Sequence, residues 1–282
     1  METQTDVKEL VRQKYSEIAL QDKDTNAASC CGATSSCCGT EVYNIMADDY
    51  TQLEGYNPDA DLGLGCGLPT QFAKIKQGDV VVDLGSGAGN DAFIARAETG
   101  ETGKVIGIDF TPAMIEKARK NIDVRGFNNV EFRQGDIEDM PLRNDMADVV
   151  VSNCVLNLVP NKEGVFNEIF RVLKYGGHFS ISDIVLVGEL PANIQNAAEM
   201  YAGCVAGAIQ KADYLTLIEK AGFSNITLQK EKVITVPDEI LKDYLSSDEI
   251  AEFKNSGTGI YSITVYAEKA KTACCEPGAG CC

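Results

Sequence analysis

The feature that most constrains the fold of this chain is a glycine-rich loop between an apolar run and a helical pattern. The run at 80–83 is Val-Val-Val-Asp, the loop at 84–89 is Leu-Gly-Ser-Gly-Ala-Gly, and residues 91–97 favour a helix. Glycine accepts positive φ and lets a ligand approach the backbone, while the start of a helix presents free N–H groups. This unit therefore predicts a binding turn at the edge of an α/β sheet.

Strand-like and helix-like segments alternate through the middle of the chain. Apolar strand patterns occur at 104–109, 130–134, 147–151 and 178–183, and helical patterns occur at 112–125 and 162–173. This alternation predicts a doubly wound, mostly parallel sheet with helices on both faces. An amphipathic helix is expected at 5–20, and residues 184–212 interrupt the alternation as a mostly helical insertion or lid. A helix at 214–221 and strands at 226–235 and 261–267 are expected to follow.

Polar side chains follow successive predicted strands. Asp83 ends the first strand, Asp109 ends the second, Asp136 comes after the third, and Asn153 comes after the fourth. The carboxyl ends of parallel strands meet at one edge of a sheet, and an acid after the second strand is placed to accept two ribose hydroxyls. A turn-capping role for Asp136 remains an alternative.

The glycine loop alone does not separate nicotinamide cofactors from S-adenosylmethionine, although its spacing favours the second. Asn90 stands where the G-x-G-x-x-G loop of nicotinamide-binding proteins has its third glycine. The leading acid in D-L-G-S-G-x-G resembles the loop of Rossmann-like methyltransferases, in which the acid after the third strand contacts the adenine amino group. The resemblance implies S-adenosylmethionine as the cofactor. The candidate residues for binding it are Asp83, Gly85, Ser86, Gly87, Gly89, Asp109, Met114, Asp136, Ile137 and Asn153.

The 11 cysteines divide into single residues and tandem pairs. Cys66, Cys154 and Cys204 are single and far apart in the sequence. The tandem pairs repeat one spacing at the two ends of the chain: Cys30, Cys31, Cys37 and Cys38, then Cys274, Cys275, Cys281 and Cys282. A lone cysteine is commonly a small buried apolar residue. The tandem pairs lack the C-x2-C spacing usual for zinc, which leaves a soft-metal relay, a redox reserve or tails without a defined role.

Several segments carry a resemblance to the arsenite S-adenosylmethionine methyltransferases, which extends from Val7 to Tyr266. They are Leu62-Gly-Leu-Gly-Cys-Gly-Leu-Pro69, Val82 to Asp91, Asp109-Phe-Thr-Pro-Ala-Met114, Val151-Ser-Asn-Cys-Val-Leu-Asn-Leu158 and Gly203-Cys-Val-Ala-Gly207. The resemblance implies that Cys66, Cys154 and Cys204 hold trivalent arsenic, and that thioredoxin or glutathione is the eventual reductant. Arsenic(III) is soft, so three thiolates suit it as ligands.

The sequence thus predicts an enzyme that methylates arsenite, or its thiol conjugates, with thiol and disulfide cycling to re-reduce the arsenic. One alternative is a methyltransferase acting on carbon in a quinone or sterol precursor, which would leave the three single cysteines unexplained. Another is a soft-metal-binding protein that retains a decayed cofactor fold, which the complete glycine loop and Asp109 oppose. A nicotinamide oxidoreductase is disfavoured by the loop spacing.

Composition excludes some partners. The net charge of −17 disfavours nucleic acid and anionic membrane surfaces. No apolar run reaches the roughly 18 residues of a membrane helix, and the acidic start does not resemble a signal peptide, so a cytoplasmic location is expected. Four regions are predicted: a helix with a mobile Cys-rich segment (1–40), the Rossmann-like cofactor domain (41–183), a substrate-binding region with the late strands (184–270), and a disordered Cys-rich tail (271–282).

Overall fold

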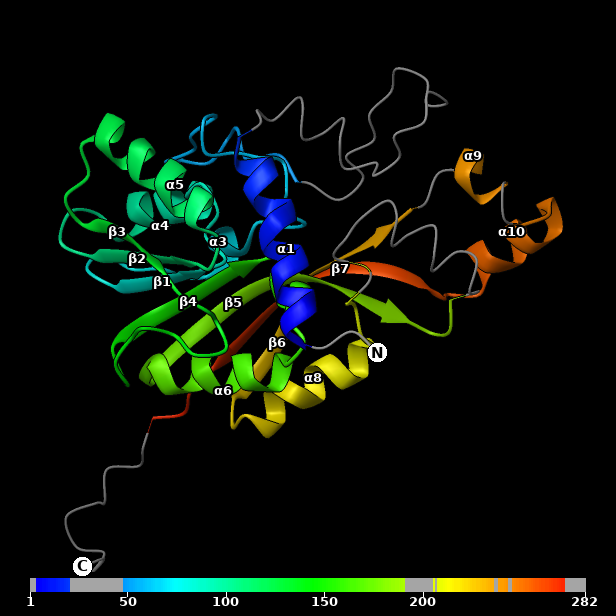
Figure 1. Cartoon of the computed structure of the whole chain (residues 1–282). Coiled ribbons are helices and arrows are strands. Elements are labelled where there is room, and N and C mark those ends of the chain that lie inside the picture. The colour runs from blue at the N-terminus through cyan, green and yellow to red at the C-terminus, as the bar shows by residue number, and fades with distance from the viewer. Residues whose placement is uncertain are drawn as a thin grey trace, which may run out of the picture.

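A computed structural model describes residues 4–20, 48–190, 205, 207–235, 238–242 and 245–271. Within them the chain forms a seven-stranded sheet in the order β3-β2-β1-β4-β5-β7-β6 (Figure 1). The strands are β1 (Val80–Leu84), β2 (Lys104–Asp109), β3 (Val130–Gln134), β4 (Ala147–Asn153), β5 (Leu173–Val187), β6 (Ser224–Ile234) and β7 (Gly259–Glu268). Strands β1 to β5 pair in parallel, whereas β7 lies antiparallel between β5 and β6. The predicted α/β, mostly parallel architecture is confirmed.

One strand is much longer than its sequence pattern indicated. The pattern predicted a strand at 178–183, but β5 continues to Val187 and pairs with β7 from His178 to Val187. Asp183, the charged residue at which the predicted strand ended, is fully buried in the sheet. The boundary predicted between 183 and 184 therefore falls inside β5.

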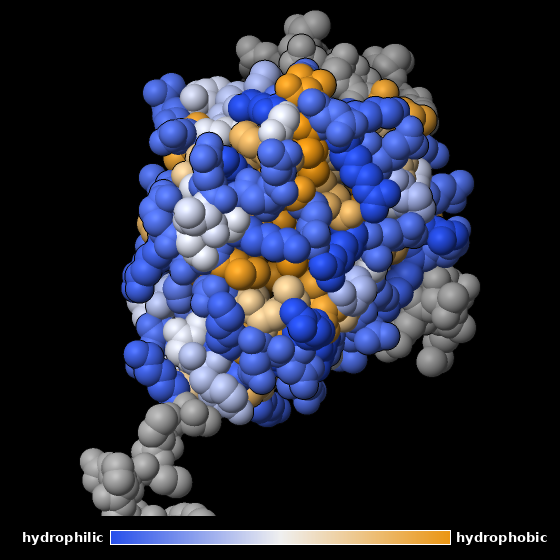
Figure 2. Space-filling model, turned by 90° about the vertical axis from the view of Figure 1, so that its left-hand side faces the viewer, coloured by the Kyte–Doolittle hydropathy of each residue, from blue (hydrophilic) through white to orange (hydrophobic). Residues whose placement is uncertain are grey.

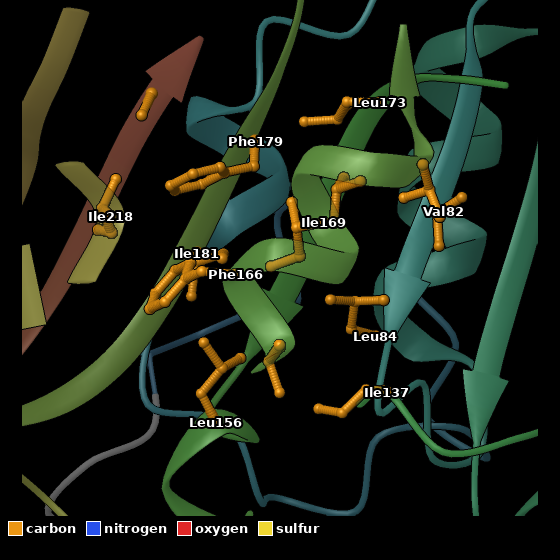
Figure 3. Packing of buried hydrophobic residues seen from close by; sticks show 14 of the residues in the cluster. Val82, Leu84, Ile137, Leu156, Phe166, Ile169, Leu173, Phe179, Ile181 and Ile218 are labelled. Atoms are coloured by element: carbon orange, nitrogen blue, oxygen red, sulfur yellow. The ribbon is translucent and has the colours of Figure 1, made fainter. Parts of the chain in front are cut away.

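Helices cover both faces of the sheet, with α4 and α5 on one face and α6 and α8 on the other (Figure 1). The helices are α1 (Gln4–Ala19), α3 (Pro69–Phe72), α4 (Asn90–Thr99), α5 (Pro112–Arg125), α6 (Lys162–Val172), α8 (Lys211–Lys220), α9 (Asp238–Leu241) and α10 (Ser247–Asn255), with a short 3-10 turn at Leu156–Leu158. Successive side chains of a strand point to opposite faces, so each strand supplies two cores. Val82 packs in the core under α6 and α8, and Val81 packs in the core under α4 and α5. Figure 3 shows Phe166 and Ile169 of α6 packed among residues of β1 and β5.

Helix α1 lies across the edge of the sheet where the parallel strands end (Figure 1). Its C-terminal end is tied to α5, because Lys117 donates to the carbonyl of Ala19 at 3.0 Å. Polar residues dominate the surface on the side of α5 and β3, with a narrow hydrophobic strip through it (Figure 2). In the described parts of the chain, no helix is both long enough and apolar enough to cross a membrane.

Some predictions concern residues outside the described ranges. These are the Cys-rich segment at 21–40, most of the inserted region with Cys204, and the tail after Lys271. They stay predictions.

Candidate active site

A cavity opens at the carboxyl ends of β1, β2 and β4. The strand order reverses between β1 and β4, and the crevice at such a reversal is where open α/β sheets bind ligands. Nine of the ten candidate cofactor residues line this cavity: Asp83, Gly85, Ser86, Gly87, Asp109, Met114, Asp136, Ile137 and Asn153. The tenth, Gly89, is the N-cap residue of α4, with φ at 101°.

Two positions of the glycine loop, Gly85 and Gly89, have no room for a side chain. Gly85 has a φ of +63°, and a Cβ there would lie 2.4 Å from Cγ2 of Val155. Around the loop, Oδ2 of Asp83, Oγ of Ser86 and Oδ1 of Asn90 are buried without a hydrogen-bond partner among the described residues. Buried polar atoms are normally paired, so these three are positioned to bind a polar ligand. The loop and its neighbours therefore fit a nucleoside or amino-acid cofactor.

Asp109 is held by two backbone amides. Its Oδ2 accepts the N–H of Gly87 at 3.0 Å and its Oδ1 accepts the N–H of Thr111 at 2.8 Å. Each carboxylate oxygen retains a second lone pair, so two ribose hydroxyls can still bind. The side chain of Thr111, the N-cap residue of α5, makes no capping hydrogen bond to that helix.

Carboxylates give the cavity an acidic lining. Burial raises the pKa of Asp83 well above its usual range, with further contributions from the charges of Asp91 and Asp109. Burial also raises the pKa of Asp91 to about 6, and the hydrogen bonds from Asn153 and Tyr50 oppose this rise. A cation in the cavity would favour the charged forms of these acids.

Asp136 is paired across the cavity mouth with Lys8 of α1, at 2.6 Å from Nζ to Oδ2. Its Oδ1 accepts the backbone N–H of Glu138, whose side chain also pairs with Lys8. Asp136 thus has both the turn-capping contact and a place in the cavity lining.

Sequence reasoning named Asn153 but missed Tyr50 and Asp91, which join it in a polar group at the cavity wall. Asn153 points its amide at the loop that contains Cys66: its Oδ1 accepts the Cys66 N–H at 3.0 Å, and its Nδ2 donates to the carbonyl of Gly67 at 2.8 Å. Tyr50 and Asp91 complete the group, with 3.0 Å between the Tyr50 hydroxyl and Oδ2 of Asp91. Asp91 had a signal in the sequence, because it is an acid in the helical turn that follows the glycine loop. Tyr50 had none.

Two of the three single cysteines lie in one buried cluster beside this wall. Cys66 and Cys154 are buried members of one apolar cluster, and Cys154 also lines the cavity. Cys154 has a φ of 61°, an uncommon conformation for a residue with a Cβ that is concentrated at functional sites. Val205, the residue after Cys204, belongs to the same cluster. Within the described ranges, no group of three or more histidine, cysteine and acidic residues could hold a metal ion.

The fold and this cavity define the class of the protein. A family model described as a methyltransferase domain matches residues 75–222, so the chain is a member of that class. Its glycine loop and the acids Asp83, Asp91, Asp109 and Asp136 lie within the matched range.

Curated relatives narrow the class. The chain is 38% identical over 262 residues to an arsenite methyltransferase of Halobacterium salinarum, covering 90% of this chain and 66% of the relative. It is 31% identical over 244 residues to the arsenite methyltransferase of Aquipseudomonas alcaligenes, covering 84% of this chain and 68% of the relative. The chain belongs to the arsenite methyltransferase family.

A solved structure supports the same family assignment. The crystal structure of an arsenic(III) S-adenosylmethionine methyltransferase from Chlamydomonas reinhardtii superposes with a TM-score of 0.62 at 32% identity, covering 81% of this chain and 74% of that one. The prediction of S-adenosylmethionine as the cofactor is confirmed at the level of the family. The chain spans about two thirds of the length of the two microbial relatives. It spans 50–55% of the length of the human, mouse and rat arsenite methyltransferases.

Proposed function

We propose that this chain transfers a methyl group from S-adenosylmethionine to trivalent arsenic, and that Cys66, Cys154 and Cys204 hold the arsenic as thiolates. The substrate is arsenite or one of its thiol conjugates. The similarity to arsenite methyltransferases supports this activity. The burial of Cys66 and Cys154 in one cluster beside the cavity supports the assignment of the ligands.

The two described cysteines fit arsenic chemistry better than an acid–base reaction. Both are buried in an apolar cluster, which suits a soft, neutral arsenic–thiolate centre. Arsenite binds by exchange, in which each thiol forms an S–As bond and its proton leaves with a hydroxide as water. Cys204 is proposed as the third ligand because Val205, its neighbour in the chain, packs in the same cluster.

Bound S-adenosylmethionine would supply an electrophilic sulfonium methyl group to the arsenic lone pair, with the S–C electron pair returning to sulfur. No residue of this chain would then need to remove a proton. Asp83, Ser86 and Asn90 hold polar cofactor groups with their buried unpaired oxygens, and Asp109 binds the ribose. The acidic lining favours a cationic cofactor over the neutral product.

Methyl transfer formally oxidises arsenic from +3 to +5. Two thiols can return it to +3 by forming a disulfide, with the electron pair passing to arsenic. We assign this step to protein thiols, with the tandem cysteines as a candidate reserve or relay and thioredoxin or glutathione as the final reductant. The cytoplasm, where thiols stay reduced, is the compartment in which this cycle can run.

The test incubates the purified chain with S-adenosylmethionine, arsenite and excess thiol, and separates the arsenic species by chromatography with element-specific detection. The wild type yields methylated arsenic, whereas Cys154→Ser yields none and still binds the cofactor in calorimetry. Cys66→Ser fails with arsenite but retains methylation of methylarsenite, because the methyl group already fills one coordination position. Arsenite methylation by Cys154→Ser at the wild-type rate would contradict the ligand assignment and favour the carbon methyltransferase.

A further inference from the structure

Asp91 lies between the cofactor loop and the loop that contains Cys66. It occupies the first turn of α4, directly after the glycine loop, and it lines the cavity. Its carboxylate receives two side chains from distant parts of the chain. The Tyr50 hydroxyl donates at 3.0 Å, and Nδ2 of Asn153 donates at 3.2 Å.

The same two side chains hold the backbone on both sides of Cys66. The Cys66 N–H donates to Oδ1 of Asn153 at 3.0 Å. The carbonyl of the following residue, Gly67, accepts from Asn153 at 2.8 Å and lies 3.0 Å from the Tyr50 hydroxyl. An amide that binds the peptide N–H before Cys66 and the carbonyl after Gly67 restricts the orientation of the two residues between them. Asp91 therefore orients the two groups that orient Cys66.

Tyr50, Asn153 and Asp91 form a clamp on the loop that contains Cys66. The loop packs against this clamp without spare volume. A Cβ at Gly65 would lie 2.7 Å from Nδ2 of Asn153, and a Cβ at Gly67 would lie 2.5 Å from Oγ of Ser182. On the far side, Ser262 donates its hydroxyl to the carbonyl of Cys66 at 2.6 Å. With both sides of the loop occupied, a change in the clamp must move the Cys66 thiol.

We propose that Asp91 is a positioning residue which, through Tyr50 and Asn153, sets the Cys66 thiol relative to the cofactor cavity. This inference rests on the proposed role of Cys66 as an arsenic ligand. It adds a physical link between the two binding sites: the Asp91 carboxylate lines the cofactor cavity and is one hydrogen bond from Tyr50 and one from Asn153, which hold the thiol loop.

The test compares two tyrosine variants that make the same chemical change in the same segment. Tyr50→Phe removes the hydroxyl that meets Asp91 and Gly67. Tyr56→Phe removes a hydroxyl that donates to Asp61 at 3.0 Å and is the matched control. Asp91→Asn is the second test variant, because it keeps the volume of the side chain and removes the charge that receives both donors.

The primary measurement is the rate at which iodoacetamide alkylates Cys66 in the folded protein, resolved by peptide mass spectrometry, with Cys154 as the internal reference. Cys66 is fully buried, so its reactivity reports opening of the loop. We expect Tyr50→Phe and Asp91→Asn to raise the Cys66 rate about tenfold, as for one lost hydrogen bond to a charged group, and Tyr56→Phe to leave it within about twofold. Unchanged Cys66 rates in both test variants would overturn the proposal, and so would an equal rise in Tyr56→Phe.

The second measurement is the kinetics of arsenite methylation. Loosening of the thiol loop raises the KM for arsenite more than the KM for S-adenosylmethionine in Tyr50→Phe, whereas general destabilisation would move both together. The thiol rates need neither arsenic nor cofactor. If the wild type does not methylate arsenite, the proposed function fails, while the positioning of Cys66 is still decided by the alkylation rates.

Discussion

The ammonium of Lys8 lies 2.6 Å from Oδ2 of Asp136, although 128 positions separate the two residues in the sequence. This contact joins α1 to the segment that follows β3. Both residues line the cavity, so the ion pair closes part of its mouth. Lys8 also pairs with Glu138, and the Lys8 and Asp136 side chains are 31% and 38% exposed.

Lys8→Ala should loosen α1 over the cavity. Because these pairs are partly exposed, the loss is about 0.2–1 kcal/mol each, and salt screens it. Amide hydrogen exchange in α1 should accelerate by up to roughly thirtyfold at low salt and less at high salt, since a tenfold change corresponds to about 1.4 kcal/mol. Lys14→Ala, an exposed lysine on the same helix, is the control. Identical exchange rates in the two variants would show that the ion pairs of Lys8 do not hold α1 over the cavity.

Asp91 should make stability depend on pH. Its pKa rises from 3.8 to about 6 on folding, so between these values the unfolded chain loses this proton first. The free energy of unfolding therefore falls as the pH rises from about 4 to 6, and the penalty is complete above the folded pKa. The charge of Asp61 also raises this pKa, whereas the hydrogen bonds from Asn153 and Tyr50 oppose the rise. The charge of Asp91 in turn raises the pKa of Asp83.

Asp91→Asn removes that penalty. Urea unfolding at pH 4, 5, 6 and 7 should show the variant gaining stability relative to the wild type at each step. Loss of the Asp91 charge also eases the raised pKa of Asp83, which adds to the same trend. A constant difference between the two proteins across this range would show that Asp91 does not titrate there.

The core of the fold and the cofactor side of the cavity could be predicted because their signals are local. The β-branched run forms β1, the glycines follow it directly, and Asp109 ends β2. The parallel register of β1 and β2 brings these residues together. The position of α1 could not be predicted: its periodicity indicates a helix, but its partner Asp136 is distant in the sequence. The clamp on Cys66 was missed for the same reason, since Tyr50 and Asn153 are 103 positions apart.

The end of the sheet shows a different limit. The patterns of β6 and β7 indicate strands, but the insertion of β7 between β5 and β6 follows from tertiary pairing. The length of β5 was underestimated because Asp183 reads as a strand end. The structure instead buries it, with its Oδ1 accepting from the N–H of Ile184 and its Oδ2 3.3 Å from the Tyr214 hydroxyl.

Lys269 should be a large single contributor to stability near the C-terminal end of the described chain. Its side chain is almost fully buried, and Nζ donates to the carbonyls of Phe170 and Leu173 and to Asp145. Lys269→Met leaves two carbonyls without this donor, at about 1–3 kcal/mol each. Urea unfolding should show a loss of that order, while the exposed control Lys271→Met stays within about 0.5 kcal/mol. If Lys269→Met were as stable as the wild type, water would have to replace the lysine ammonium at these carbonyls.

Gly85 in the glycine loop and Gly126 at the end of α5 provide a matched pair of sites for substitution by alanine. Gly85 and Gly126 have φ values of +63° and +69°, so alanine strains the backbone similarly at both, by about 1–2 kcal/mol. At Gly126 nothing lies within 4 Å of the added Cβ, whereas at Gly85 it would meet Val155 at 2.4 Å. Gly126→Ala should therefore lower stability and leave cofactor affinity unchanged. Gly85→Ala must also displace the loop beneath Asp83 and Ser86, so calorimetry should show S-adenosylmethionine binding weakened at least tenfold. Comparable cofactor affinities in the two folded variants would remove the loop from the binding site.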